Sequence, residues 1–145
     1  MSPTAFDSSL ARSLLFRMLV MSRTSEILAS PDHRLISLLL WIGTTEAVLL
    51  EIPGDIGHPV EHHYRRVNQS PIHKLKTYIE MLRHMERHRY CVLSGPGMDK
   101  HHFLTWLIGY GESHVKRIVS TEEQLSGTRQ SLLDLRTHLN RRLGE

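Results

Sequence analysis

Histidine is the residue type that offers the most chemistry in this chain. The sequence contains 11 histidines, and most of them fall between residues 62 and 102. Glu80, His84 and His88 are four residues apart, so on a helix they would share one face at the spacing of metal ligands. A second set that could complete a zinc site comprises His62, His63, His101 and His102. Because so many histidines produce such spacings readily, we favour exposed polar histidines with no metal and no cofactor.

The sequence carries no other recognisable catalytic pattern. It lacks an HExxH or CxxC motif, and "SGPGMDK" at 94–100 lacks the spacing and the Lys-Ser/Thr ending of a phosphate-binding P-loop. Cys91 is the only cysteine, which excludes an internal disulfide and fits a reducing compartment. Its apolar neighbours predict a buried, inert thiol, with redox sensing as the alternative. We therefore expect a protein that is not an enzyme.

The charges are segregated along the chain. Residues 62–100 hold eight Lys or Arg against three Asp or Glu, whereas residues 1–61 hold four against seven. A basic block inside a chain of net charge +3 is typical of an element that binds a polyanion. The alternative is a basic face that contacts only solvent.

The basic block contains the clearest helix signal of the sequence. Ser70 can cap a helix that starts at Pro71, a residue favoured at the first helical position. Ile72, Leu75, Ile79, Leu82 and Met85 make its predicted buried stripe. If this helix enters a DNA major groove, the side chains available to bases and phosphates are Arg65, Arg66, Gln69, Ser70, His73, Lys74, Lys76 and Thr77.

The rest of the chain predicts a mainly helical protein. Helices are expected at 6–29, 32–42 and 60–67, while "TTEAVLLEI" at 44–52 can be helix or strand. The segments "YCVL" and "HHFLTWLI", at 90–93 and 101–108, can form a hairpin whose tip carries Lys100 and His101, although the second can equally be helix. "STEE" at 120–123 is a capping-box pattern that predicts the start of the final helix.

This order of elements resembles the MarR-type winged helix-turn-helix regulators. The resemblance is carried by the helix-turn-helix at "YRRVNQSPIHKLKTYIEML", the wing at "MDKHHFLT" and the closing "STEEQLSGTRQSLLDLRTHL". It implies a single domain with dimerisation helices at 1–30 and 120–145, around a winged helix-turn-helix core at 31–108. The dimer interface that it implies comprises Leu10, Leu14, Met21, Leu125, Leu132, Leu135 and Leu139.

From these features we expect a homodimeric regulator of transcription that binds duplex DNA. The resemblance also implies a small-molecule effector, whose identity the sequence leaves unknown. The alternative is a helical adaptor or chaperone-like protein that binds other proteins without DNA. The apolar stretch at 35–52 contains Glu46, and its uninterrupted apolar part is far short of the ~20 apolar residues that span a bilayer. Together with an N-terminus that lacks a secretion signal, this predicts a cytoplasmic protein without membrane contact.

Overall fold

The protein folds around a mixed five-stranded β-sheet. The computed structural model describes residues 36–53, 58–110 and 112–144. Their elements, in chain order, are β1 (Leu38–Ile42), β2 (Ala47–Glu51), β3 (Val60–Tyr64), α2 (Pro71–Met85), β4 (Cys91–Gly95), α3 (Asp99–Tyr110), α4 (Glu112–Val115), β5 (Ile118–Glu123) and α5 (Arg129–Gly144). The expected mainly α-helical winged helix-turn-helix is therefore wrong.

The sheet has the strand order β3-β2-β1-β4-β5. β1, β2 and β3 form an antiparallel meander, in which Leu38 pairs with Glu51 and Glu51 pairs with Val60. β4 and β5 then add parallel to β1, through crossovers that contain helices. Such crossovers cover the sheet, which explains why the central strands are apolar on both faces.

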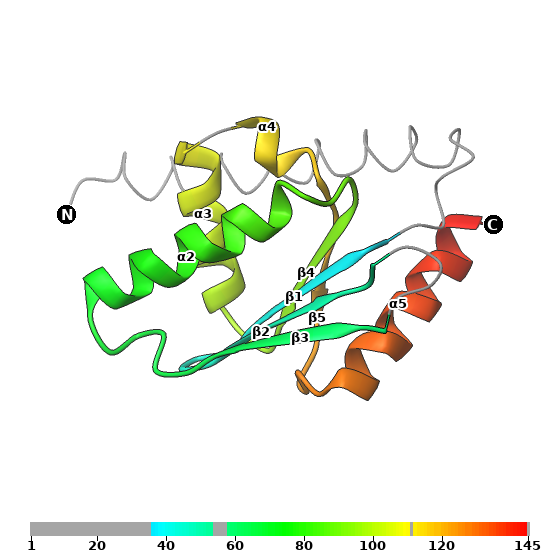
Figure 1. The fold of residues 1–145 in the computed structure, drawn as a ribbon, viewed down its shortest axis with the longest axis horizontal. Helices are drawn as coiled ribbons and strands as arrows, with labels where there is room; N and C mark the ends of the chain where they lie inside the picture. The colour runs from blue at the N-terminus through cyan, green and yellow to red at the C-terminus, as the bar shows by residue number, and fades with distance from the viewer. Residues whose placement is uncertain (1–35, 54–57, 111, 145) are drawn as a thin grey trace.

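Helices cover both faces of this sheet, as Figure 1 shows. On one face, α2 and α3 pack over a core that includes Leu40, Leu49 and Leu93. On the other face, α5 packs over a second core that includes Leu39 and Leu50. Consecutive strand residues therefore enter different cores, because side chains alternate across a strand.

The helix predicted from Ser70 is confirmed, but its buried stripe is shifted. The Ser70 side chain accepts a hydrogen bond from the backbone N–H of His73 at 3.1 Å, and Pro71 occupies the first turn. The buried residues of α2 are Thr77, Tyr78, Met81, Leu82 and Met85. Two members of the predicted stripe lie outside, since Ile72 is 69% and Leu75 is 45% exposed.

Two other predicted helices are wrong, and a third segment that was left open is now assigned. In the described part of 32–42, residues 38–42 form a strand, because "LLLWI" is buried on both faces rather than along one helical stripe. Residues 60–64 are strand as well, with His62 and Tyr64 on one face and Glu61 and His63 on the other. The segment 44–52, left open between helix and strand, contains β2.

The wing and the closing helix also differ from expectation. Residues 99–110 are helix, which is the alternative that the sequence left open for 101–108. β4 pairs in parallel with β1 and β5, so the predicted hairpin at 90–108 is wrong. The "STEE" pattern lies in β5, where the Ser120 hydroxyl donates to Glu122 at 2.6 Å instead of capping a helix. α5 starts only at Arg129. The capping pattern was misleading because a strand that pairs with β4 overrides a local preference.

The leucines of the closing helix serve the fold of one chain. Leu132 and Leu139 are 0% and 4% exposed in the core beneath α5, and Leu135 packs against that core. Leu125, by contrast, is 88% exposed in the loop before α5. The remaining predicted interface residues, Leu10, Leu14 and Met21, lie outside the described residues. Homodimerisation stays a prediction. Leu132 and Leu139 cannot contribute to a dimer interface, because both are buried within one chain.

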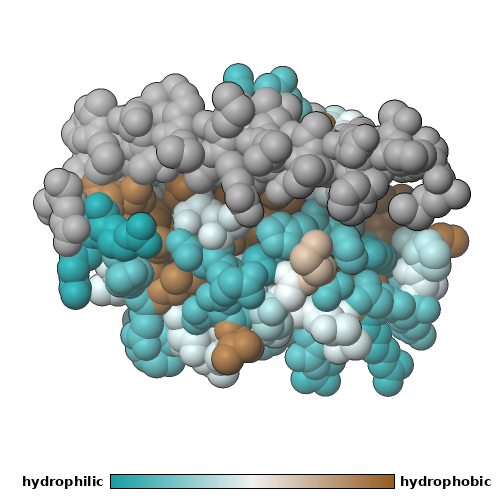
Figure 2. Space-filling view, turned by 180° about the vertical axis from the view of Figure 1, so that it is seen from behind, coloured by the Kyte–Doolittle hydropathy of each residue, from teal (hydrophilic) through white to brown (hydrophobic). Residues whose placement is uncertain are grey.

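The surface that is described is mainly polar. The side of the molecule seen from behind is largely hydrophilic, with hydrophobic patches among polar side chains (Figure 2). Within the described ranges, no helix is long and apolar enough to cross a bilayer.

Candidate metal centre

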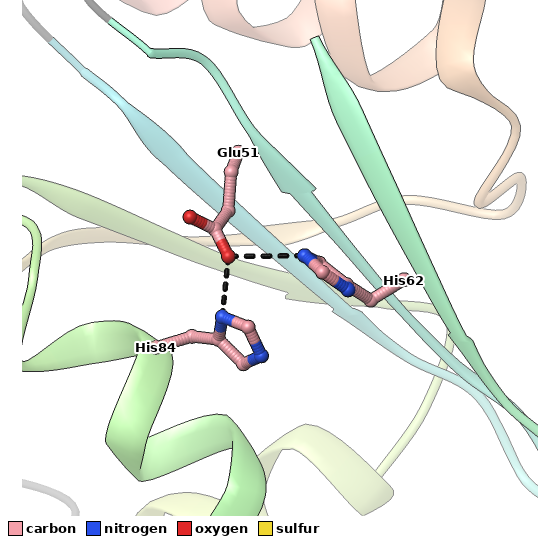
Figure 3. Close-up of side chains that lie close together, drawn as sticks. All are labelled: Glu51, His62 and His84. Atoms are coloured by element: carbon pink, nitrogen blue, oxygen red, sulfur yellow. Dashed lines mark hydrogen bonds and ion pairs between the residues drawn. The ribbon is translucent and has the colours of Figure 1, made fainter.

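Three side chains from separate elements meet beside the edge strand of the sheet. Glu51 is the last residue of β2, His62 lies in the middle of β3, and His84 lies in the last turn of α2. Figure 3 shows both imidazole rings directed toward one oxygen of the Glu51 carboxylate. The sheet sets this arrangement, because β2 and β3 are adjacent and α2 packs over the face on which all three side chains lie.

The three donor atoms are close enough to share one ion. His62 Nε2 is 3.0 Å from Glu51 Oε1, and His84 Nδ1 also contacts Oε1. One ligand atom from each residue lies within 4.8 Å of the other two. The His62 and His84 rings lie with their centroids 4.4 Å apart and their planes tilted by 40°. Zinc bonds of about 2.0–2.2 Å place tetrahedral ligand atoms roughly 3.4 Å apart, so this spacing suits a metal ion after small adjustments.

His84 differs from Glu51 and His62 in that its donor nitrogen has no hydrogen bond. Its Nδ1 atom is buried and lacks a hydrogen-bond partner among the described residues, although it lies against Glu51 Oε1. The contact therefore lacks the orientation of a hydrogen bond. Buried polar atoms in folded proteins are nearly always bonded, so an unbonded imidazole nitrogen requires an explanation. A ligand that takes its lone pair would provide one.

A third histidine contacts the other oxygen of the carboxylate. His88 Nε2 lies 3.0 Å from Glu51 Oε2, and His88 Nδ1 lies 2.8 Å from the Ser37 hydroxyl. Burial alone would raise the pKa of Glu51, but the hydrogen bond with His88 and the charges of His84 and His88 lower it below its usual value. Glu51 is therefore a carboxylate at neutral pH, with Oε2 fixed and Oε1 directed toward His62 and His84.

Tyr64 adds a neutral hydroxyl beside the cluster. It follows His62 on the same face of β3, since the two residues are separated by one position. Burial, followed by the charges of Glu80 and Glu51, raises the pKa of Tyr64 to about 12. The phenol therefore stays protonated at neutral pH and remains a hydrogen-bond donor.

Two His and one Glu form a donor set known from hydrolytic zinc centres. In such centres three protein ligands leave a fourth position for water or substrate, which the metal then polarises. His62 is 33% exposed at its side chain, whereas His84 and Glu51 are each 15% exposed. Glu51 and His84 are thus largely buried, whereas solvent reaches the cluster from the side of His62.

The histidine spacing in the sequence pointed to part of this cluster. His62 and His84 belong to the two sets that the sequence offered, and His88 contacts Glu51 rather than completing the three-residue set. Glu80 is exposed, and His63 faces away, toward Glu61 at 3.2 Å. His101 and His102 belong to α3 and are not part of the three-residue set. Glu51 was missed, although a glutamate that ends the apolar run "AVLLE" was a usable signal once that run is assigned as a strand.

The predicted DNA-contacting residues are divided by their burial. Exposed ones are Arg65, Arg66, Gln69, Ser70 and Lys76, while His73, Lys74 and His101 are half-buried. Thr77 is 4% exposed and donates to the His73 carbonyl at 3.0 Å. Lys100 is 2% exposed and belongs to the start of α3 rather than to a wing tip. Thr77 and Lys100 are therefore not available to DNA in this structure.

Comparisons of the chain with protein-family models, with curated proteins and with solved structures found no match.

Proposed function

We propose that the protein binds one divalent transition-metal ion through Glu51 Oε1, His62 Nε2 and His84 Nδ1. The observation that carries this proposal is the meeting of three ligand atoms within 4.8 Å, one of them a buried nitrogen without a hydrogen bond. An ion in this place would satisfy that nitrogen and would replace the direct contacts between the carboxylate and the two imidazoles.

The donor set favours zinc over magnesium or calcium. Imidazole nitrogen is a preferred ligand of zinc, copper, iron and nickel, whereas magnesium and calcium select oxygen ligands. The contact between His88 and the second carboxylate oxygen resembles the outer-shell bonds that orient metal ligands in proteins. Three protein ligands leave an exchangeable position, so the ion could act as a Lewis acid on a bound water or substrate.

The test is zinc binding measured by competition with a chromophoric chelator at neutral pH. Replacing Glu51→Gln or His84→Gln should weaken binding by more than roughly 100-fold, because each removes a direct ligand and outer-shell losses alone cost about 10–100-fold. His62→Asn removes the Nε2 atom and should do the same. His63→Asn is the matched control, since His63 is the next residue of β3 but faces Glu61.

Equal weakening by His62→Asn and His63→Asn would contradict the proposal, because it would mean that zinc binds surface histidines at large. Unchanged affinity in Glu51→Gln would also contradict it. Circular dichroism of each variant separates loss of the site from loss of the fold.

A second candidate function is nucleic-acid binding, which the exposed basic residues around α2 favour. Arg65, Arg66, Lys76, Arg83 and Arg87 are exposed, and none of them forms an ion pair within the described part of the chain. Exposed Lys and Arg without ion-pair partners are the groups that neutralise phosphates. This candidate retains the predicted DNA binding but not the winged-helix fold. The predicted cytoplasmic location is proposed together with it.

Salt dependence tests this second candidate. If about six phosphates are contacted, affinity for a labelled duplex should fall by roughly 10³-fold between about 50 and 200 mM salt. Binding that does not respond to salt, or no binding in low salt, would contradict it and favour the protein-binding adaptor. Fluorescence anisotropy gives either result directly.

A further inference from the structure

An apolar pocket opens between α2 and α3, away from the metal centre. Its volume is about 460 Å³, within the range of sites that hold small organic groups. The lining is contributed by the first half of α2 and by α3, and comprises Pro71, Lys74, Leu75, Tyr78, His102, Thr105 and Trp106. The metal ligand of α2, His84, lies in the last turn of the same helix, so the two features occupy different ends of α2.

Aromatic rings make one wall of this pocket. The Tyr78 and Trp106 ring centroids are 5.4 Å apart, and Trp106 stacks on Tyr110 at 5.1 Å with an interplanar angle of 24°. Tyr110 is 62% exposed, so this aromatic row extends from the core to the surface. Exposed aromatic rings beside an apolar pocket form a surface on which a flat ring can stack.

A lysine and a histidine belong to the lining of the same pocket. Lys74 comes from α2, with Nζ 5.8 Å from the centre of the Tyr78 ring, and His102 comes from α3. The pocket therefore combines an aromatic wall with a cationic side chain at its edge, and proteins hold a base and its phosphate with these two kinds of group.

One acidic residue lies near the pocket. Asp99 begins α3 and, after burial, is the second cause that raises the pKa of Tyr78 to about 12. The charge of Asp99 thus acts on the Tyr78 hydroxyl, which stays protonated at neutral pH. Among the described residues, the lining itself contains Lys74 and no acidic side chain, so the edge of the pocket keeps a positive charge.

From the aromatic lining and the lysine at its edge we infer that this pocket takes one unpaired base of a single-stranded nucleic acid, with an adjoining phosphate at Lys74. The inference rests on the second candidate function and specifies its ligand. A duplex keeps its bases stacked inside, whereas a single strand can place a base against protein aromatics.

The experiment compares two labelled oligonucleotides of about 12 nucleotides, a length within the range of known single-strand sites. One carries pyrimidine bases and the other is abasic, so both offer the same phosphates. Fluorescence anisotropy should show that the protein binds the base-bearing strand on the order of tenfold more tightly than the abasic one. A free nucleoside monophosphate should compete only at much higher concentration, because it offers a single phosphate.

A matched pair of α2 variants places the effect in the pocket. Leu75→Asp introduces a carboxylate into the lining and should abolish the preference for bases. Ile72→Asp adds the same charge at a position that is 69% exposed and outside the lining, and it should keep the preference. Both residues are exposed, at 45% for Leu75, so both variants are expected to fold.

The outcomes separate this inference from the function on which it rests. Equal, salt-sensitive affinity for both strands would overturn the base pocket and leave nucleic-acid binding in place. Failure to bind either strand in low salt would overturn both. A nucleoside monophosphate that competes as well as the oligonucleotide would assign the pocket to a free nucleotide and overturn the single-strand inference.

Discussion

Two clusters of buried charged groups differ in how completely their atoms are bonded. At the β4–α3 loop, Lys100 is 2% exposed and donates to Gly95 O at 3.0 Å, Gly97 O at 2.7 Å and Glu123 Oε1 at 2.5 Å. Beside β2, Glu51 is surrounded by three histidines, yet His84 Nδ1 lacks a hydrogen bond among the described residues. All three donors of the lysine form hydrogen bonds, whereas one imidazole nitrogen of the second cluster has an ion-pair contact but no hydrogen bond.

This difference distinguishes a structural charge from a candidate ligand. Lys100 links the loop that follows β4 to the end of β5, and the last residue of β4 leaves no room for a side chain. Gly95 has a φ of +155°, and a Cβ there would lie 2.1 Å from the Ile42 carbonyl oxygen. A cluster whose bonds are complete has nothing left to offer a ligand, while an incomplete one gains stability when a ligand binds.

The largest effect is expected for Lys100→Met. It removes three hydrogen bonds and leaves the Gly97 carbonyl oxygen without this donor, while the Gly95 carbonyl oxygen keeps the bond from the Gln124 N–H at 3.2 Å. The free energy of unfolding should therefore fall by about 2–4 kcal/mol. Urea unfolding at neutral pH measures the change. Lys116→Met is the matched control, because Lys116 is exposed, and it should change stability by less than about 0.5 kcal/mol. If both variants behave alike, the structural role of Lys100 is wrong.

Zinc bound at the cluster around Glu51 should raise the free energy of unfolding by slightly less than Lys100→Met lowers it. At a free concentration near 100 times its Kd, an ion that binds only the folded state adds about 2.7 kcal/mol to the free energy of unfolding. Thermal unfolding with and without zinc measures this as a rise in Tm. The rise should also occur in Lys100→Met, because that lysine belongs to a separate cluster. A rise that disappears in Lys100→Met would mean that the two clusters are coupled.

A smaller effect is expected for His84→Gln without metal. His84 Nδ1 has no aligned hydrogen bond to lose, so the cost is its ion-pair contact with Glu51 and its packing against His62, and the free energy of unfolding should fall by only about 0.5–1 kcal/mol. Urea unfolding in the presence of a chelator measures it. A loss as large as that of Lys100→Met would show that His84 is a structural residue like Lys100, and it would remove the contrast between the clusters.

The sequence predicted the local features of α2 but not the sheet around it. Ser70 and Pro71 act on their own helix, so the cap could be recognised without knowledge of the fold. β1 and β4 are apolar on both faces because they lie in the middle of the sheet, and this hides the period-two pattern that identifies a strand. Without those strands, Leu132 and Leu139 could be interpreted as a dimer surface.

The metal centre was only partly predictable for the same reason. Glu51, His62 and His84 are brought together by the antiparallel pairing of β2 with β3 and by the packing of α2. Spacing along the chain identified ligands on one helix, such as Glu80, His84 and His88, since only neighbours along a helix can be placed from sequence. In the fold, one helix contributes His84 to the set and the two strands contribute the rest.

The smallest effect is expected from Glu123, the exposed partner of Lys100. The hydrogen bond from Lys100, opposed by burial and aided by the lysine charge, lowers the pKa of Glu123 below 4.5 in the folded state. A lowered pKa means that the ionised carboxylate stabilises the fold above pH 4.5, and this contribution is lost as the pH falls through the folded-state value. Urea unfolding should therefore show Glu123→Gln slightly less stable than the wild type at neutral pH and equal to it in acid. Glu112→Gln, at another exposed glutamate, should show no such pH-dependent difference. If Glu123→Gln matches the wild type at neutral pH, Lys100 is held by the two carbonyl oxygens alone, and the cluster is complete without its carboxylate.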